Sequence, residues 1–335
     1  MSVTQSDCAC FAAVDQSWDT PSANGGRPSN IKLTSNVLYN VWQAVTTAQK
    51  TAGQELCYKI FFKNSNSAGE IGMTPWMCVT KPNPTDEWNW IVEGDQDNHQ
   101  SDLTGTERRY TCSDLNANVS AGATSIALQL DAVELKDCYQ TGDTVVVYDS
   151  RLSLANSSCV WETAKITAVA QAGSVLTLTL ETGLQNTYTQ ATGKCAGIIK
   201  CSSGFGPSVG NYAQAGTGTY NHADYPVTLN NAGTVRQDWT LTYDGAGNVD
   251  VTGDALGSLG SFPISADIAP VNPVFSKPYF TVDFAGHGNA HLAGDTFKFS
   301  TYASVKALFW FKKTPPNCGQ IPLTSTSIAI MFETA

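Results

Sequence analysis

Two closely spaced histidines are the residues of this chain best placed for metal chemistry. His287 and His291 lie four residues apart, and paired imidazoles bind zinc and other transition metals when a regular element aligns them. Here the intervening residues are glycine, asparagine and alanine, and no HExxH motif is present. We therefore interpret residues 286–291 as a polar loop, with a two-histidine metal site as the alternative.

An acidic run follows the pattern of an ion-binding loop over part of its length. Asp95, Asp97 and Asp102 place carboxylates close together, as calcium loops do. The run departs from the EF-hand pattern because its sixth position is Gln100, where glycine is required, and no glutamate occupies the twelfth. We interpret it as a solvated acidic loop, with an ion site of another type as the alternative.

The sequence motifs give little evidence of nucleotide binding or of catalysis. The sequence contains neither a P-loop nor a G-x-G-x-x-G turn. Glycoside hydrolysis needs two carboxyl groups that face each other across a cleft, and the spacing of Asp95 and Asp97 does not establish one. We predict that the chain is not an enzyme, has no catalytic residues and uses no cofactor. A polysaccharide hydrolase acting through carboxylates of residues 86–102 is the enzymatic alternative.

Three tryptophans are candidates for a binding surface. Trp76, Trp88 and Trp90 could stack on sugar rings, and the acidic loop follows the last two closely. Tryptophans more often anchor cores and interfaces, because they combine a large apolar ring with one polar N–H group. We interpret them as core or interface anchors, with glycan binding as the alternative.

The elements that must position these residues are mostly strands. Residues 1–30 lack a sustained period and predict an extended arm. Apolar residues at helical spacing from Val37 to Ala48 predict one helix, with Ser35 or Asn36 as its cap and Gly53 as its end. Strand patterns surround it, so we predict that residues 31–106 form part of a β-sandwich.

Two further β regions follow. Short alternating segments separated by turns predict a small barrel-like module over residues 107–200. Residues 201–335 repeat the alternation and predict a second, immunoglobulin-like sandwich, with 258–273 as a long Gly-, Ser- and Pro-rich loop. The predicted fold class is therefore all-β, with several domains and one short helix.

The amino-acid composition limits the kinds of partner that we expect the chain to bind. Only 14% of the residues are charged, against about 25% in an average globular domain. The formal net charge of −10 argues against nucleic acid, because phosphate binding depends on Lys and Arg. The first fifteen residues lack the basic start and apolar run of a secretory signal, and no apolar stretch reaches eighteen residues. We expect a protein without membrane insertion.

Ten cysteines are unusual in a chain without a recognisable export signal. Most are either buried small hydrophobic residues or partners in disulfides formed after release from a reducing cytoplasm. No zinc-type spacing accompanies them. Cys57 and Cys78 are predicted to lie on neighbouring strands within disulfide reach. The middle module carries an even set that could form two bridges, namely Cys112, Cys138, Cys159 and Cys195.

Several segments resemble a family of tailed-bacteriophage structural proteins. They are 38–42 (LYNVW), 58–64 (YKIFFKN), 103–110 (LTGTERRY), 225–230 (YPVTLN), 233–240 (GTVRQDWT) and 277–281 (KPYFT). The resemblance implies a virion protein, assembled in the host cytoplasm and released by lysis, and carries over no functional residues.

The resemblance also implies partners and a place in the particle. We expect the chain to contact other virion proteins and copies of itself as a homo-oligomer, in the tail or baseplate. The neck, collar or head exterior, or a module that binds a host-surface glycan, are the alternatives. The cysteine content and the arm depart from the family pattern. They suggest disulfides between subunits, for which Cys8, Cys10 and Cys318 are the candidates.

Overall fold

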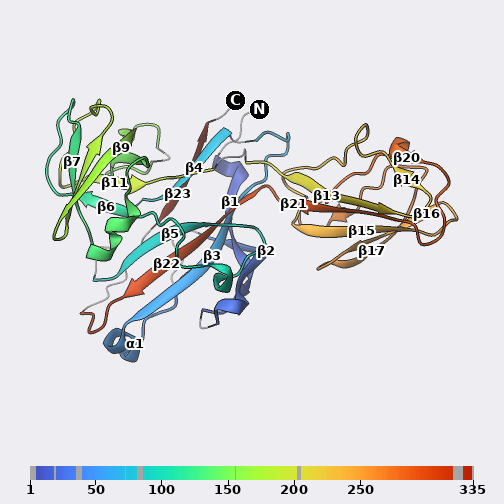
Figure 1. The fold of residues 1–335 in the computed structure, drawn as a ribbon, viewed down its shortest axis with the longest axis horizontal. Helices are drawn as coiled ribbons and strands as arrows, with labels where there is room; N and C mark the ends of the chain where they lie inside the picture. Colours follow the sequence, from blue (N-terminus) through green and yellow to red (C-terminus); the bar gives the residue numbers. More distant parts are fainter. Residues whose placement is uncertain are drawn as a thin grey trace.

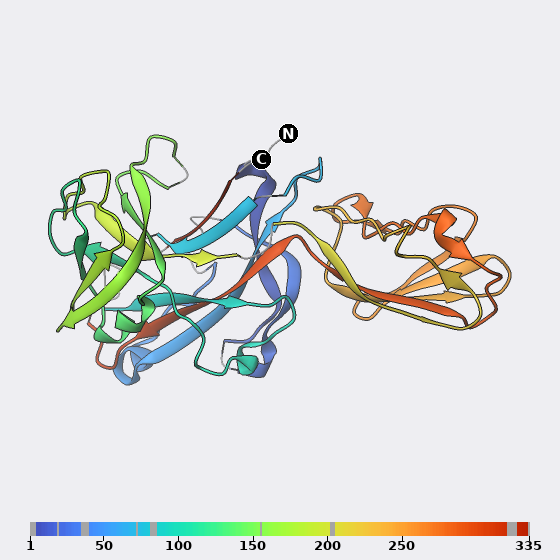
Figure 2. The same ribbon diagram turned by 45° about the horizontal axis from the view of Figure 1, so that its top comes forward.

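Three β-sheet units lie in a row along an elongated molecule (Figure 1). The computed structural model describes residues 5–18, 20–34, 40–71, 73–80, 86–154, 156–201, 205–319 and 327–333. The central unit carries strands from both ends of the chain, the barrel lies on one side of it, and the distal unit lies on the other, as a second view confirms (Figure 2). The predicted all-β class is confirmed.

The central unit consists of two sheets. The larger sheet has five antiparallel strands, in the order β2 (Asn24–Leu33), β1 (Cys8–Gln16), β3 (Gln54–Asn64), β22 (Val305–Thr314) and β5 (Trp88–Gly94). The smaller sheet contains β12 (Ile199–Lys200), β4 (Met73–Val79) and β23 (Ile328–Glu333). Since β3 pairs with β22 over ten residues, the sheet joins segments about 250 positions apart.

Both ends of the chain differ from their predicted roles. Residues 1–30 were predicted to be an arm, but β1 pairs with β3 and β2 along the sheet, so most of this segment is part of the central unit. Residues 201–335 were predicted to be one sandwich, but β22 and β23 return to the central unit. The barrel and the distal unit are therefore both inserted between strands of the central unit.

The helix is shorter and starts later than predicted. Within the described residues, Asn40 to Thr46 are not helical, and α1 spans Thr47–Ala52. The Thr46 hydroxyl accepts a hydrogen bond from the Gln49 N–H in a capping box, and the chain leaves the helix at Gly53 as predicted. The predicted cap residues Ser35 and Asn36 lie outside the described residues. Trp42 packs in the core without a helix, with its ring 5.4 Å from that of Trp310.

Residues 112–197 form a closed six-stranded barrel within the predicted 107–200 module. Its strands are β6 (Cys112–Leu115), β7 (Ser125–Gln129), β8 (Thr144–Asp149), β9 (Trp161–Ala172), β10 (Val175–Leu180) and β11 (Gly193–Gly197). Leu176, Leu178 and Leu180 alternate with polar residues along β10 and are buried. This alternation fills the barrel interior, because successive strand side chains point to opposite faces.

The distal unit, residues 208–302, is built on a five-stranded sheet. Its strands in order are β13 (Ser208–Ala215), β21 (Thr296–Tyr302), β15 (Gln237–Tyr243), β16 (Asn248–Gly253) and β17 (Gly257–Pro263). Two short ribbons accompany the sheet, β14 (Thr219–Tyr220) with β20 (His287–Gly288) and β18 (Val271–Asn272) with β19 (Lys277–Pro278). The predicted loop 258–273 is wrong over its first part, because β17 adds to the sheet as an edge strand.

Short 3₁₀ helices lie between the strands. They are Gln5–Asp7, Pro21–Ala23, Gln100–Asp102, Val133–Cys138 and Phe284–Gly286. None of the helices in the described ranges is long and apolar enough to cross a membrane.

The two faces of the larger central sheet contribute to different cores. Leu308 and Trp310 of β22 pack in a cluster shared with the smaller sheet. Phe309 and Phe311, which alternate with them, pack in a cluster that continues into the barrel interior. The distal unit has a separate core of its own, centred on Trp239. The barrel is thus fused to the central unit by apolar packing, whereas the distal core is independent.

Candidate functional site

A buried lysine occupies the oxygen cluster that the sequence suggested as an ion site. Lys59 of β3 is 1% exposed, and its Nζ donates hydrogen bonds to the carbonyl oxygens of Asn98 at 2.6 Å and Gly26 at 2.8 Å. It also donates to Asn98 Oδ1 at 2.9 Å. The Lys59 amino group therefore satisfies both oxygens of Asn98 in the acidic loop and the carbonyl oxygen of Gly26. Among the described residues, no group of three His, Cys, Asp or Glu side chains is arranged to hold a metal ion.

Burial changes the protonation of this lysine. It lowers the pKa of Lys59 to about 7, and the carboxylates of Asp97, Asp95 and Asp102 oppose that shift. The loop itself is fixed by local hydrogen bonds, because the Asp102 carboxylate accepts from the His99 N–H at 2.7 Å. The acidic loop is therefore a structural element that encloses a buried lysine.

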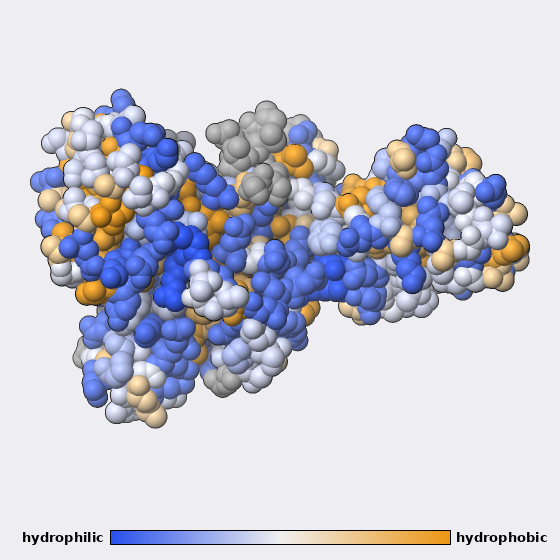
Figure 3. Space-filling model, in the orientation of Figure 1, coloured by the Kyte–Doolittle hydropathy of each residue, from blue (hydrophilic) through white to orange (hydrophobic). Residues whose placement is uncertain are grey.

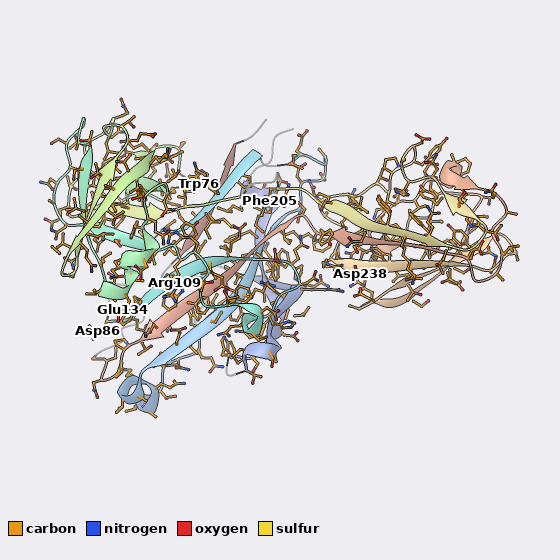
Figure 4. The ribbon with its side chains drawn as sticks, viewed as in Figure 1. Trp76, Asp86, Arg109, Glu134, Phe205 and Asp238 are labelled. Atoms are coloured by element: carbon orange, nitrogen blue, oxygen red, sulfur yellow. The ribbon has the colours of Figure 1, made fainter. Side chains whose placement is uncertain are left out.

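Five charged residues join the acidic loop to the distal unit. We call Arg27, Asp97, Arg236, Asp238 and Asp254 the ionic junction. The Arg27 guanidinium contacts Asp97 at 3.0 Å and both oxygens of Asp254 at 2.9 and 2.7 Å. Arg236 contacts Asp97 at 2.6 Å and Asp238 at 2.7 Å, and its hydrogen bonds lower the pKa of Asp238. Figure 3 shows hydrophilic residues gathered where the central and distal units meet, and Figure 4 places Asp238 at that end of the distal unit.

An open groove of about 770 Å³ runs beside the ionic junction. Charged residues from the acidic loop, β5 and β22 line it together with polar groups of the distal unit, including Glu93, Asp95, Asp97, Asp102, Lys306 and Tyr302. Gln96 spans the groove end, donating from Nε2 to the Ala303 carbonyl and accepting from the Ala303 N–H, each at 2.9 Å. The groove is acidic, and two of its carboxylates, those of Asp97 and Asp102, make the contacts described above.

Two of the three candidate tryptophans are buried between the central sheet and the barrel. Trp88 and Trp90 are 8% and 5% exposed, and Trp90 stacks on Phe311 with ring centroids 5.2 Å apart. They are anchors within the molecule and offer no surface to a glycan. Trp76 is half-buried and lies 6.0 Å from the ring of Trp161, which is 39% exposed. Figure 4 shows Trp76 on the side of the central unit that faces the barrel.

The cysteines form no disulfides, and all ten are free thiols. The prediction that Cys57 and Cys78 lie on neighbouring strands is wrong, because β3 and β4 belong to different sheets. Cys112 and Cys195 lie on paired strands, but Cys195 pairs with Ser113 and Cys112 with Ala196. Their side chains therefore point to opposite faces of the barrel wall.

The remaining candidate thiols are held in apolar or acidic surroundings. Cys138 and Cys159 are buried, and burial raises the pKa of Cys138 to about 12. Burial likewise raises the pKa of Cys8 and Cys10 to about 12. The Cys318 pKa is raised by burial and by Asp86, whose carboxylate lies 3.9 Å from its sulfur. A thiol that resists ionisation reacts slowly in disulfide exchange, so these surroundings slow the formation of disulfides at these positions.

The two candidate histidines meet at the distal unit. His287 Nδ1 lies 3.3 Å from His291 Nε2 and 3.3 Å from the Tyr243 hydroxyl. Burial and the neighbouring His291 lower the pKa of His287 to about 4. The segment is therefore not a fully solvated polar loop, as its composition indicated. Both histidines pack against Tyr243, which is over forty residues away in the sequence.

The sequence also contains a short match to a catalytic motif that the sequence analysis did not identify. Residues 206–210 (GPSVG) match the letters of the G-x-S-x-G nucleophile elbow, with Ser208 as the central residue. Ser208 begins strand β13, so the motif lacks the strand-to-helix turn that exposes a nucleophile. The match is therefore a turn entering a strand.

No known protein family matches this sequence, and no curated protein matches it. The function is therefore argued from the geometry and from the resemblance of the segments named above.

Proposed function

We propose that this chain is a structural component of a tailed-bacteriophage particle, in the tail or baseplate, and that it acts by assembly. The resemblance of six segments to such proteins and the elongated all-β architecture support the proposal. The neck, collar and head exterior are the alternative positions.

The main supporting observation is that several polar and aromatic groups suggested as site residues contact other parts of the same chain. Lys59 closes the acidic loop, the arginines of the ionic junction pair with its aspartates, and Trp90 packs inside the molecule. These groups connect parts of the same chain and leave little polar chemistry for a substrate. The carboxylates of Asp97 and Asp102 take part in such contacts, which argues against their use by the hydrolase alternative.

We expect the chain to assemble through open edges of its sheets. In the described part of the distal unit, β17 pairs only with β16, and five of its seven residues are exposed. A strand of a neighbouring copy or of another virion protein can add to such an edge through backbone hydrogen bonds. We infer a homo-oligomer, because symmetric repetition multiplies each such contact.

The test is to locate the chain in the particle. Mass spectrometry of gradient-purified particles should detect it in stoichiometric amounts, and a cryo-EM map should show its three-unit outline in the tail or baseplate. Presence in the infected-cell lysate together with absence from purified particles would refute the proposal.

A host-surface glycan is the second candidate partner, and one observation favours it. Trp161 is 39% exposed beside the half-buried Trp76, and such a pair can stack on a sugar ring. Glycan-array binding by the purified chain that disappears in Trp161→Ala would support this role. Binding that persists unchanged in Trp161→Ala would contradict it.

A further inference from the structure

Two histidine rings meet inside the distal unit with more polar atoms than partners. His287 Nδ1 lies 3.3 Å from His291 Nε2 and 3.3 Å from the Tyr243 hydroxyl. The outer nitrogens of the pair, His287 Nε2 and His291 Nδ1, are buried without partners among the described residues. His291 is 8% exposed, and its ring stacks on that of Tyr243 with centroids 3.7 Å apart. The pair is therefore a buried polar group whose hydrogen-bonding capacity is only partly used.

The number of protons on the pair decides whether it can stay closed. Two neutral imidazoles carry one N–H each, so one inner nitrogen can donate to the other. A charged imidazole carries an N–H on both nitrogens, so its charge lies beside a buried outer N–H for which the described residues offer no acceptor. When both rings are charged, both inner nitrogens are donors and face each other across 3.3 Å with like charges. Acid therefore opposes the closed arrangement at each protonation step.

Two carboxylates act on the pair, and both are engaged by backbone donors. The Asp295 carboxylate accepts hydrogen bonds from three N–H groups at 2.7–3.2 Å, and that of Asp283 accepts one at 2.8 Å. Burial lowers the pKa of both histidines, that of His287 to about 4 with the neighbouring His291 as a second cause. Asp283 opposes the pKa shift of His287 without cancelling it. Asp295 opposes that of His291 in the same way.

The pair connects the β14–β20 ribbon to the sheet of the distal unit. His287 lies on β20 and pairs with Tyr220 of β14, and the two ring centroids are 5.2 Å apart. His291 follows the ribbon and stacks on Tyr243 of β15. Burial raises the pKa of both tyrosines, that of Tyr220 to about 12, so each phenol is uncharged when the histidines titrate. Among these four rings, the histidines are the ones that change charge in mild acid.

The backbone leaves His291 little room to turn away from its partner. A Cβ atom on Gly218 would lie 2.1 Å from His291 Nδ1, so the ring lies directly against the chain that enters β14. Asp295 ties the same backbone, since its carboxylate accepts from the Gly218 N–H at 2.7 Å and from the Leu292 N–H at 3.0 Å. Repulsion between charged rings is therefore relieved by movement of the ribbon and not by rotation of one side chain.

We propose that the contact between His287 and His291 holds the β14–β20 ribbon on β15 at neutral pH and releases it in mild acid, when the rings take up protons from solvent. The five-stranded sheet stays intact, because its backbone ladder involves neither histidine. The release is a property of the distal unit and does not depend on the proposed place in a particle.

The direction of the pH effect follows from the two states of the rings. In the released state a histidine has its ordinary pKa of 6.5, whereas the closed contact lowers the pKa of His287 to about 4. The released state therefore binds the proton more tightly, so the closed state is most favoured above pH 6.5 and becomes less favoured as the pH falls toward 4. For His287 alone, the ratio of released to closed ribbon should rise about 20-fold between pH 7 and pH 5.

Amide hydrogen exchange of the full-length chain, followed by mass spectrometry, measures the release. After correction for the intrinsic pH dependence of exchange, residues 217–222 and 284–292 should lose protection about 20-fold between pH 7 and pH 5, while barrel strand β10 stays unchanged. The double substitution His287→Phe, His291→Phe keeps two rings without a titrating group and should remove this loss. His222→Phe is the matched control and should keep it, because His222 stacks on Tyr212 outside the pair.

A measurement on the unaltered chain covers a double variant that fails to fold. Long-range ¹H–¹⁵N spectra should show the ring nitrogens of His287 and His291 gaining protons over the same pH range in which the ribbon amides lose protection. Equal protection of the ribbon at pH 7 and pH 5 would overturn the proposal. A loss of protection that persists in the double variant would also overturn it, as would titration of both rings near pH 6.5 with the ribbon still protected.

Discussion

The central unit meets the barrel through a large apolar core, and meets the distal unit through ion pairs and a small apolar cluster. On the barrel side, Trp88, Trp90 and Phe311 belong to one apolar cluster that runs from the central sheet into the barrel interior. On the distal side the two main cores are separate. Charged residues such as Arg27 and Arg236 make contacts there, and Phe275 of the distal unit adds a small apolar cluster with the central sheet.

The comparison indicates how firmly each neighbour is attached. Apolar burial contributes roughly 25 cal/mol per Å² and is little affected by salt. Partly exposed ion pairs contribute about 1 kcal/mol or less each, and salt screens them. We therefore expect the barrel and the central unit to unfold together, whereas the distal unit can change its orientation at small cost.

The largest effect is expected on the apolar side. Trp90→Ala removes a ring that stacks on Phe311 and should lower the free energy of unfolding by about 3–5 kcal/mol. Urea unfolding followed by far-UV circular dichroism measures it. Trp161→Ala is the matched control, because that ring is 39% exposed and its loss should have a much smaller effect. Equal losses in the two variants would contradict the distinction.

The next effect concerns Lys59, the buried lysine enclosed by the acidic loop. Lys59→Met keeps the chain length but leaves the oxygens of Gly26 and Asn98 without their donor. The free energy of unfolding should fall by about 3 kcal/mol at pH 7. Lys165→Met, which breaks an exposed pair with Glu181 in the barrel, is the control and should change stability by less than about 1 kcal/mol.

The pH dependence of that difference tests the state of the lysine. The folded pKa of Lys59, about 7, is below the ordinary value of 10.5, so the unfolded chain binds the proton more tightly. This group's contribution is therefore most favourable above 10.5 and declines as the pH falls through 7. Relative to Lys59→Met, the natural chain should gain about 2 kcal/mol between pH 7 and 9. A flat difference would show that the carboxylates keep the ammonium charged.

The smallest effect is expected at the ionic junction. Asp97→Asn weakens contacts to both Arg27 and Arg236 and should cost about 1 kcal/mol. Small-angle X-ray scattering should show a broader range of distal-unit orientations, and 0.5 M salt should produce a similar change in the natural chain. The Lys165→Met variant again serves as control. A scattering profile insensitive to both changes would mean that Phe275 and Lys63, which pack where the units meet, fix the orientation.

Local patterns predicted strands well where one face is buried. The alternation predicted for residues 107–200 and 201–335 corresponds to strands with one buried face, such as β10, β15 and β16. Alternation carries this information because burial of one sheet face requires it. Edge strand β17 escaped prediction because its glycines and serines interrupt the alternation, and only Leu259 and Phe262 pack against the distal core.

By itself the sequence determined the all-β class and the barrel-like middle module, since these follow from composition and short-range periodicity. Only the tertiary structure decided that the N-terminal segment is part of a sheet, that Lys59 occupies the acidic loop, and that Tyr243 meets the two histidines. Each of these depends on residues distant in sequence. Strand pairing and burial are set by the whole chain, which local periodicity does not record.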